Sequence, residues 1–345
     1  MILKELKIGD LTAKIPIVQG GMGIGVSLAN LAAAVANEGG IGTISGVQIG
    51  FREPDFLNNP VEANLRAIGK EIKKAREKSK GIIAMNFMAA MNNYELYVKK
   101  AVEEKIDIIV SGAGLPIALP KLTKGTNTKI APIVSSAKAA KIIIRSYLKS
   151  DRLPDAIIVE GPLAGGHLGF KMDELLENKC MPLKDIVKEV KSLLRAFEEE
   201  YKVKIPLIAA GGIRTGEDIL ELEEAGADGF QLASLFVPTI ECDAHENFKS
   251  TYVNADDENI KIIKSPVGMP GRAIETNFLK GAGKVILTRC YRCMPGCNPR
   301  EIPYCISEGL INSVEGRDGL VFSGANLNDV NKITTVKEVI NSLIC

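Results

Sequence analysis

The feature that most constrains the fold is a regular alternation of short apolar runs with amphipathic stretches. Eight apolar, β-prone runs occupy residues 15–18, 40–44, 81–87, 106–110, 129–134, 155–159, 205–209 and 228–232. Helical patterns follow most of them, at residues 28–37, 94–104, 137–149, 182–200 and 218–225. Runs that are apolar on both faces are typical of strands in a parallel sheet covered by helices. The sequence therefore predicts an α/β fold with a parallel sheet.

Eight β/α units favour a closed barrel over an open sheet. They fit within roughly the first 240 residues, and a (β/α)8 barrel has about 250. The alternative, a doubly wound open sheet, usually has fewer strands and a phosphate loop after the first. We predict a TIM barrel over residues 1–237. Residues 238–345 would form a helical and loop extension packed on it, in which 238–289 are helix and loop, 319–326 return to the barrel mouth, and 336–344 form a final helix.

Charge and composition limit the class of partner. The 345 residues include 43 basic and 42 acidic side chains, for a net charge of +1, and no tryptophan. A nucleic-acid groove or an anionic membrane partner would require a basic surface, which this balance does not indicate. No signal peptide is visible and no apolar run approaches the ~20 residues of a membrane helix. We expect a cytoplasmic protein with a small-molecule substrate, and a homodimer is left open.

Active sites of such barrels form where the strands end. Small and polar residues collect at these ends, at positions 19–25, 86–88, 111–114, 135–136, 160–169, 210–215 and 231–234. The loops after the seventh and eighth strands usually bind phosphate. Gly211 and Gly212 can offer backbone N–H groups there, and Ala233 and Ser234 can add a helix start and a hydroxyl. The alternative is that the two glycines only make a tight turn.

The loop at residues 160–169 carries the residues with the clearest potential for acid–base chemistry. It follows the sixth run, contains four glycines, and holds His167, one of two histidines in the chain. An imidazole in a glycine-rich loop at a strand end is suited to proton transfer, although a structural histidine is the alternative. Glu160 is either a hydrogen-bond partner of ligand hydroxyls or a structural carboxylate. His245 lies in a polar region and is predicted to be solvated.

A second glycine-rich run, at residues 20–25, is a weak dinucleotide motif. It satisfies the Gly-x-Gly-x-x-Gly spacing, but an acidic ribose partner about 20 residues later is missing. We expect this backbone to pack against a flat ring.

Several of these motifs, in order, resemble one known family. They are residues 16–23, Asn86 with Phe87, and residues 160–169, 209–213 and 227–234. The sequence resembles the nitronate monooxygenases, formerly called 2-nitropropane dioxygenases. These are FMN-dependent (β/α)8 barrels related to the flavin-dependent enoyl-ACP reductase II.

The resemblance implies FMN as the cofactor and a role for each matching residue. Gly21 and Met22 would lie against the isoalloxazine ring, and Asn86 and Glu160 would hydrogen-bond the flavin. The ribityl chain and phosphate would be held by a further set, namely Gly165, Gly212, Gln231, Leu232, Ala233 and Ser234. His167 would be the catalytic acid or base.

The activity implied is oxidation of alkyl nitronates to carbonyl compounds and nitrite. Two departures of this sequence from the family pattern concern the implied activity. The monooxygenases usually have glutamine at position 160 whereas the reductases more often have glutamate, and Pro162-Leu163-Ala164 lacks the family's acidic residue beside the histidine. The alternative is an NAD(P)H-dependent enoyl thioester reductase. The second alternative is a flavin- or metal-binding protein without turnover.

Four late cysteines form a separate candidate site. Cys290, Cys293, Cys297 and Cys305 lie within sixteen residues in the extension. Their spacing allows an iron–sulfur cluster or a zinc site. Free thiols in a lid are the alternative.

Overall fold

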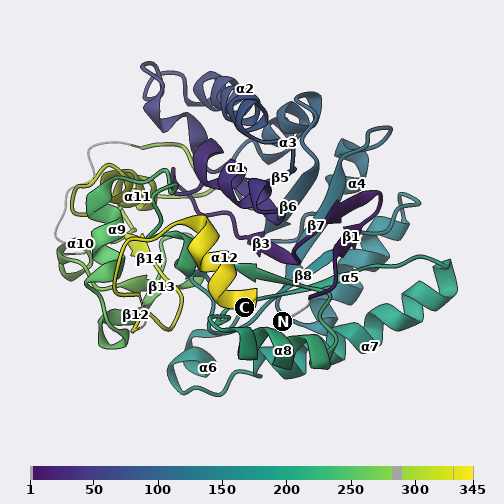
Figure 1. Ribbon diagram of the computed structural model, residues 1–345. Helices are drawn as coiled ribbons and strands as arrows, with labels where there is room; N and C mark the ends of the chain where they lie inside the picture. Colours follow the sequence, from purple (N-terminus) through teal and green to yellow (C-terminus); the bar gives the residue numbers. More distant parts are fainter. Residues whose placement is uncertain (1–2, 282–289, 329, 345) are drawn as a thin grey trace.

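The computed structural model describes residues 3–281, 290–328 and 330–344, and its centre is a closed barrel of eight parallel strands (Figure 1). Neighbouring strands pair in parallel all round the ring. Every predicted apolar run supplies one strand, so the predicted TIM barrel is confirmed. The strands are β3 (Ile17–Gln19), β4 (Ile41–Ser45), β5 (Ile82–Met88), β6 (Ile108–Gly112), β7 (Lys129–Val134), β8 (Ile157–Glu160), β10 (Leu207–Ala210) and β11 (Gly229–Leu232).

Helices between the strands cover the outside of the barrel. They form because apolar residues recur at helical spacing and side chains cap their ends: the Thr215 hydroxyl accepts the Asp218 N–H, and the Asp218 carboxylate accepts the Thr215 N–H. Their buried faces and the outward side chains of the strands make one continuous core. The helices of this ring are α1 (Ala29–Asn37), α2 (Pro60–Lys78), α3 (Tyr94–Glu103), α4 (Leu119–Leu122), α5 (Ala137–Leu148), α7 (Leu183–Tyr201) and α8 (Gly216–Ala225). The short α6 (Met172–Leu176) lies in the connection from β8 to α7 and buries Leu175 in a separate small cluster.

An N-terminal hairpin closes the bottom of the barrel, where the strands begin. Strands β1 (Leu6–Ile8) and β2 (Leu11–Ala13) pair antiparallel across a turn in which Gly9 has a φ of +60°. Leu6 and Ile8 are buried among inward side chains of the barrel such as Val18 and Ile208. The hairpin was not among the predicted elements, but its packing leaves only the opposite end of the barrel open.

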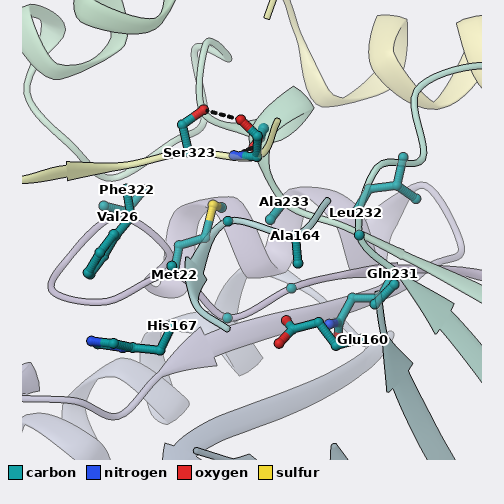
Figure 2. A pocket seen from close by; sticks show the side chains of 18 of the residues that line it. Met22, Val26, Glu160, Ala164, His167, Gln231, Leu232, Ala233, Phe322 and Ser323 are labelled. Atoms are coloured by element: carbon teal, nitrogen blue, oxygen red, sulfur yellow. Dashed lines mark hydrogen bonds between the residues drawn. The ribbon is translucent and has the colours of Figure 1, made fainter. Parts of the chain in front are cut away.

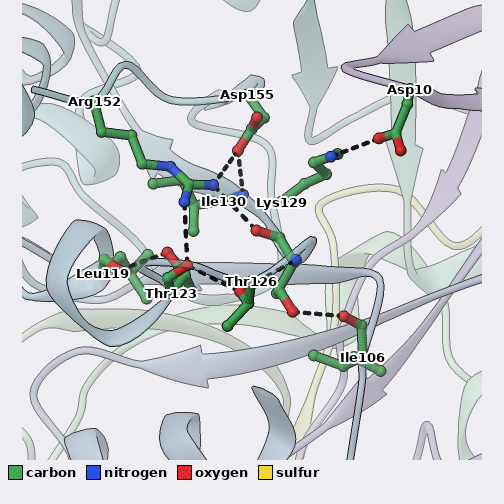
Figure 3. A network of polar contacts seen from close by, with 10 residues as sticks. Asp10, Ile106, Leu119, Thr123, Thr126, Lys129, Ile130, Arg152 and Asp155 are labelled. Carbon is green, nitrogen blue, oxygen red and sulfur yellow. Dashed lines mark hydrogen bonds and ion pairs between the residues drawn. The ribbon is translucent and has the colours of Figure 1, made fainter. Parts of the chain in front are cut away.

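A repeated polar contact joins neighbouring strands at this bottom end. The Asp155 carboxylate accepts the Ile130 N–H at 2.8 Å and a hydrogen bond from Arg152 at 2.9 Å (Figure 3). The same arrangement of aspartate, backbone N–H and cation recurs twice, at Asp107 with Ile83 and Arg76, and at Asp228 with Leu207 and Lys191. Because each aspartate precedes one strand and contacts the start of the strand before it, the contacts hold the strands in register.

The chain after β11 departs from the β/α alternation and forms a unit beside the barrel (Figure 1). Residues 238–289 were predicted to be helix and loop; the described part does contain helices, but two strands that were not predicted lie there as well. Strands β12 (Ile260–Lys264) and β13 (Pro270–Ile274) pair antiparallel across a turn containing Ser265, Pro266 and Gly268. The other elements are η2 (Ser234–Phe236), α9 (Glu246–Val253), η3 (Asp257–Asn259), α10 (Asn277–Lys280), α11 (Ile306–Val314) and β14 (Val321–Phe322).

The final helix, α12 (Val336–Ile344), returns to the barrel and confirms the predicted helix at 336–344. It packs between α1 and α8 and buries Val336, Val339, Ile340 and Leu343 in the main barrel core. By its packing, α12 is the eighth helix of the ring. The domain boundary at residues 237 and 238 stays a prediction.

The unit also stabilises the first barrel helix. The Asp243 carboxylate accepts the N–H groups of Leu28 and Leu31 at 2.8 and 3.1 Å, at the start of α1. A carboxylate satisfies the unpaired donors at a helix N-terminus and interacts favourably with the helix dipole. Among the described residues, no helix is long and apolar enough to cross a membrane.

Candidate active site at the carboxyl end of the barrel

One pocket at the carboxyl end of the strands brings together every residue predicted for the catalytic and cofactor sites (Figure 2). The strand ends form its floor, and the residues after β11 form its roof. The eleven predicted residues that line it are Gly21, Met22, Asn86, Glu160, Gly165, His167, Gly212, Gln231, Leu232, Ala233 and Ser234. Their individual roles remain predictions, but their assembly at one site is a structural result.

Two polar side chains flank the floor at the same level of the barrel. Glu160 on β8 and Gln231 on β11 both pair in register with Ala210 of the strand between them. The Gln231 side chain is 8% exposed, and its Oε1 atom has no hydrogen-bond partner among the described residues. Because an unpaired buried acceptor is costly, this atom is suited to receive a donor from a bound ligand.

Glu160 has an unusual environment for a carboxyl group. It forms no hydrogen bond or ion pair within the described part of the chain, and burial raises its pKa to about 7. Removal from water disfavours the charged form of an acid, so Glu160 is largely protonated below neutral pH. It can then act as a hydrogen-bond donor, and it becomes an anion as the pH rises through 7.

The glycine-rich run after β3 lies against Asn86 of β5. A Cβ atom on Gly21 would lie 2.4 Å from the Asn86 Cβ, so only glycine allows this approach of backbone and side chain. The neighbouring Met22 is fixed because its N–H donates to the Ser27 hydroxyl at 2.8 Å. The result is a smooth backbone surface at one wall of the pocket, as expected for contact with a flat ring.

Gly211, Gly212 and Ser234 gather near the end of the pocket formed by β10 and β11. Gly211 and Gly212 have φ values of +95° and +84°, which side-chain-bearing residues rarely adopt. The Ser234 hydroxyl accepts the Gly324 N–H at 2.9 Å, so the roof contacts the predicted phosphate loop directly. Both glycines line the pocket, so phosphate binding stays a prediction for them beside the alternative of a tight turn.

His167 sits on a short strand that belongs to the sheet of the extension. Strand β9 (Gly166–His167) pairs antiparallel with β13, with His167 opposite Gly271 and Gly166 opposite Arg272. The imidazole Nε2 lies 2.9 Å from the Ser265 hydroxyl, and the ring packs edge-on against Phe322. Burial lowers the pKa of His167 to about 4, so the ring is neutral at physiological pH.

Arg272 holds the loop that carries His167. Its guanidinium Nη1 donates to the carbonyl oxygens of Pro162 at 2.7 Å and Ala164 at 2.6 Å, and the side chain is 7% exposed. These two carbonyls belong to the Pro162-Leu163-Ala164 segment in which the sequence departs from the family pattern. A side chain from the extension thus holds the backbone of this segment.

Sequence reasoning missed Ser265, Arg272 and most of the roof. The prediction that residues 319–326 return to the barrel mouth is confirmed. The roof residues that line the pocket are Phe248, Tyr252, Leu310, Ser313, Phe322, Ser323, Gly324, Ala325 and Asn326. The turn residues Ser265-Pro266-Val267-Gly268, which follow the isoleucine-rich run at residues 260–264, were a signal for the hairpin. Nothing local in the sequence indicates that this hairpin pairs with β9.

The cysteines lie away from the pocket lining, and the metal prediction finds no support. No group of three or more histidine, cysteine, aspartate or glutamate side chains could hold a metal ion among the residues described. Burial raises the pKa of the Cys293 thiol and raises that of Cys305 to about 11, so both side chains are neutral thiols in this structure. His245 is exposed, as predicted, and its Nδ1 accepts the Asn247 N–H at the start of α9.

Comparison with known proteins places the chain in a family. The family model for nitronate monooxygenase matches residues 4–345. A probable nitronate monooxygenase of Staphylococcus aureus strain MSSA476 is 22% identical over 295 residues, covering 78% of each chain. FabK from Thermotoga maritima is similar in structure, with a TM-score of 0.72 and 26% identity over 96% of this chain and 91% of that chain.

A third protein shares the fold. A nitroalkane oxidase from Streptomyces ansochromogenes has a TM-score of 0.68 and 19% identity, covering 96% of this chain and 94% of its own. The family match extends over nearly the whole chain, through the extension as well as the barrel. This protein is therefore an oxidoreductase that belongs to the nitronate monooxygenase family.

Proposed function

We propose that this protein is an FMN-dependent oxidoreductase that oxidises alkyl nitronates, with O₂, to carbonyl compounds and nitrite. The observation that carries the proposal is the position of His167, a neutral imidazole that lines a pocket otherwise built to receive a flat ligand. The family match and the curated relative support the same activity.

The residues of the pocket fit FMN. The glycine backbone beside Asn86 suits a flat ring, the unpaired Gln231 Oε1 suits a donor of the cofactor, and Gly212 and Ser234 suit its phosphate end. When bound, FMN would supply the redox centre of the reaction. Glu160, protonated below pH 7, would offer a further donor from β8.

The low pKa of His167 helps to decide whether the substrate is a neutral nitroalkane or an anionic nitronate. An imidazole whose pKa has fallen to about 4 is a weak base, because catalytic bases work best with pKa values near the operating pH. It is therefore unsuited to removing a proton from a neutral nitroalkane. A nitronate has already lost that proton, and the neutral imidazole needs only to orient it by a hydrogen bond. We infer a preference for nitronates over nitroalkanes.

A second candidate function is the reduction of enoyl thioesters by NAD(P)H. The observation that favours it is Glu160, which stands where the resemblance leads us to expect glutamine in a monooxygenase. The 26% identity to FabK over most of both chains adds support. In this reaction, His167 would hydrogen-bond the thioester carbonyl and stabilise the negative charge that develops on its oxygen.

One anaerobic experiment separates these functions. The purified holoprotein is mixed with propyl-2-nitronate or with NADH, and the visible spectrum of the flavin is recorded. Bleaching by the nitronate is the expected result, and bleaching by NADH alone would move the assignment to the reductase. Bound flavin that responds to neither reagent indicates a binding protein without turnover. Absence of bound flavin in protein reconstituted with excess FMN contradicts both activities.

Replacing Glu160 with glutamine should remove a pH dependence from nitronate turnover. As the pH rises through about 7, Glu160 ionises, and its charge would repel the anionic substrate. In the wild type, kcat/KM should therefore fall about tenfold between pH 6 and 8.5, since it reports groups of the free enzyme. In Glu160→Gln the fall should vanish. Steady-state rates with pre-formed nitronate measure kcat/KM at each pH. An identical pH profile in both proteins would show that a group other than Glu160 titrates.

A further inference from the structure

Of the two nitrogens of His167, only Nε2 has a hydrogen-bond partner among the described residues. Nε2 lies 2.9 Å from the Ser265 hydroxyl, whereas Nδ1 makes no hydrogen bond to any residue that the structure describes. Since His167 lines the pocket, Nδ1 is the nitrogen left for a ligand. Whether it donates or accepts there depends on which way the hydrogen bond to Ser265 runs.

The surroundings of Ser265 decide that direction. The side chain is 2% exposed, and its hydroxyl oxygen also faces the Val267 N–H, at 3.5 Å. The only acceptor that the described residues offer to the hydroxyl proton is Nε2 of His167. If Nε2 carried a proton, the oxygen would face two donors and its own proton would be buried without an acceptor, which costs roughly 1–3 kcal/mol. The hydroxyl therefore donates and Nε2 accepts.

The backbone holds the two residues in this geometry. Ser265 begins the turn between β12 and β13, where its N–H donates to the Met269 carbonyl at 3.1 Å and its own carbonyl accepts the Gly268 N–H at 3.0 Å. The same hairpin pairs with β9 through Gly271 and His167. Both sides of the hydrogen bond are thus parts of one small sheet, so the imidazole has little freedom to turn.

We propose that Ser265 is a positioning residue that holds His167 as the tautomer with its proton on Nδ1. His167 then presents an N–H donor to the pocket and cannot accept a proton there. This deepens the proposed function and rests on it for the substrate: the donor would bind a nitronate oxygen, or the carbonyl oxygen in the second candidate reaction. The tautomer of His167 is inferred from hydrogen bonds within this chain, so it does not depend on which substrate the protein uses.

The chain offers an internal reference for the measurement. His245, the other histidine, accepts the Asn247 N–H at Nδ1, so its proton must lie on Nε2 when the ring is neutral. Long-range ¹H–¹⁵N correlation spectra of the holoprotein at pH 8 should therefore show opposite patterns for the two rings. His167 should have a pyridine-type shift at Nε2, and His245 at Nδ1. A His245→Gln variant assigns the signals, and a pyridine-type shift at Nδ1 of His167 would overturn the proposal.

Variants of Ser265 test whether its hydroxyl holds the tautomer of His167. Ser265→Ala should move the ¹⁵N shifts of His167 toward a mixture of tautomers, whereas Ser265→Thr, which keeps the hydroxyl, should retain the wild-type pattern. Unchanged His245 signals verify folding. The matched control is Ser135→Ala, which removes a hydroxyl bonded to the Gly169 carbonyl of the same loop. Unchanged His167 shifts in Ser265→Ala would refute the role of Ser265.

Kinetics then separate this inference from the proposed function. Ser265→Ala should lower kcat about tenfold to a hundredfold with little change in KM, the range known for partners that orient the histidines of metal sites. If the wild type turns over neither nitronate nor enoyl thioester, the proposed function fails, and the NMR result still decides the tautomer. If turnover is normal but unaffected in Ser265→Ala, the positioning role fails alone.

Discussion

Replacing His167 with alanine is expected to lower kcat for nitronate turnover about a hundredfold to a thousandfold while bound FMN is retained. The expected size is that of losing one preorganised hydrogen-bond donor to the anionic substrate in a water-poor site. His167 lines the pocket, but the predicted cofactor contacts come from other strands, so flavin content should change little. Steady-state kinetics and the flavin-to-protein ratio after gel filtration provide the two measurements.

Two further variants sharpen this result. His167→Gln keeps an N–H donor but cannot act as a base, so it should recover part of the activity that alanine loses. His245→Ala removes the exposed histidine at the start of α9 and should leave kcat unchanged. Full turnover in His167→Ala would exclude a catalytic role for this residue. Equal loss in the alanine and glutamine variants would instead favour a base over a donor.

Replacing Arg272 with methionine should destabilise the protein and impair the site together. The variant keeps the unbranched apolar stem of the side chain but leaves the carbonyls of Pro162 and Ala164 without their donor. Hydrogen bonds to charged groups contribute about 1.5–3 kcal/mol each. Because the two bonds share one nitrogen, we expect a loss of about 2–4 kcal/mol in the free energy of unfolding. Urea titration of the holoprotein, followed by circular dichroism, measures this loss.

The functional consequence of Arg272→Met follows from the position of the freed loop. Residues 162–164 connect Glu160 to His167, so a mobile loop should raise KM and weaken flavin retention. Arg317→Met is a matched control in the extension, because Arg317 is exposed and pairs only with Glu315 among the described residues. Its stability should stay within about 0.5 kcal/mol of the wild type. An Arg272→Met variant as stable and as active as this control would show that the loop holds its own shape.

The barrel and the floor of its pocket were predictable because their signals are local. Strands buried on both faces require near-continuous apolar runs, and β7 at Lys129–Val134 matches the predicted run residue for residue. Strand ends that meet a ligand require small residues, which placed Gly21 and Gly212 in the predicted set. Both rules operate within a few residues of sequence, so they can be applied before the chain is folded.

The contacts that were missed all join distant segments. Arg272 lies 110 residues from Pro162 in sequence, and a buried arginine that bonds to carbonyls has no local pattern. The hairpin of β1 and β2 has strands of three residues each, too short for a periodicity to be recognised. The four late cysteines show the opposite limitation: their spacing allowed a metal site, but the packing of the described residues does not form one.

The return of α12 to the barrel has a consequence for synthesis of the protein on the ribosome. The ring of helices lacks its eighth member until α12 has left the exit tunnel, although the strands are complete more than a hundred residues earlier. A nascent chain would therefore expose the apolar faces of α1 and α8 during this interval. Premature termination anywhere in the extension would remove a wall of the barrel core. Cellular proteases should therefore degrade such truncated chains faster than the full chain.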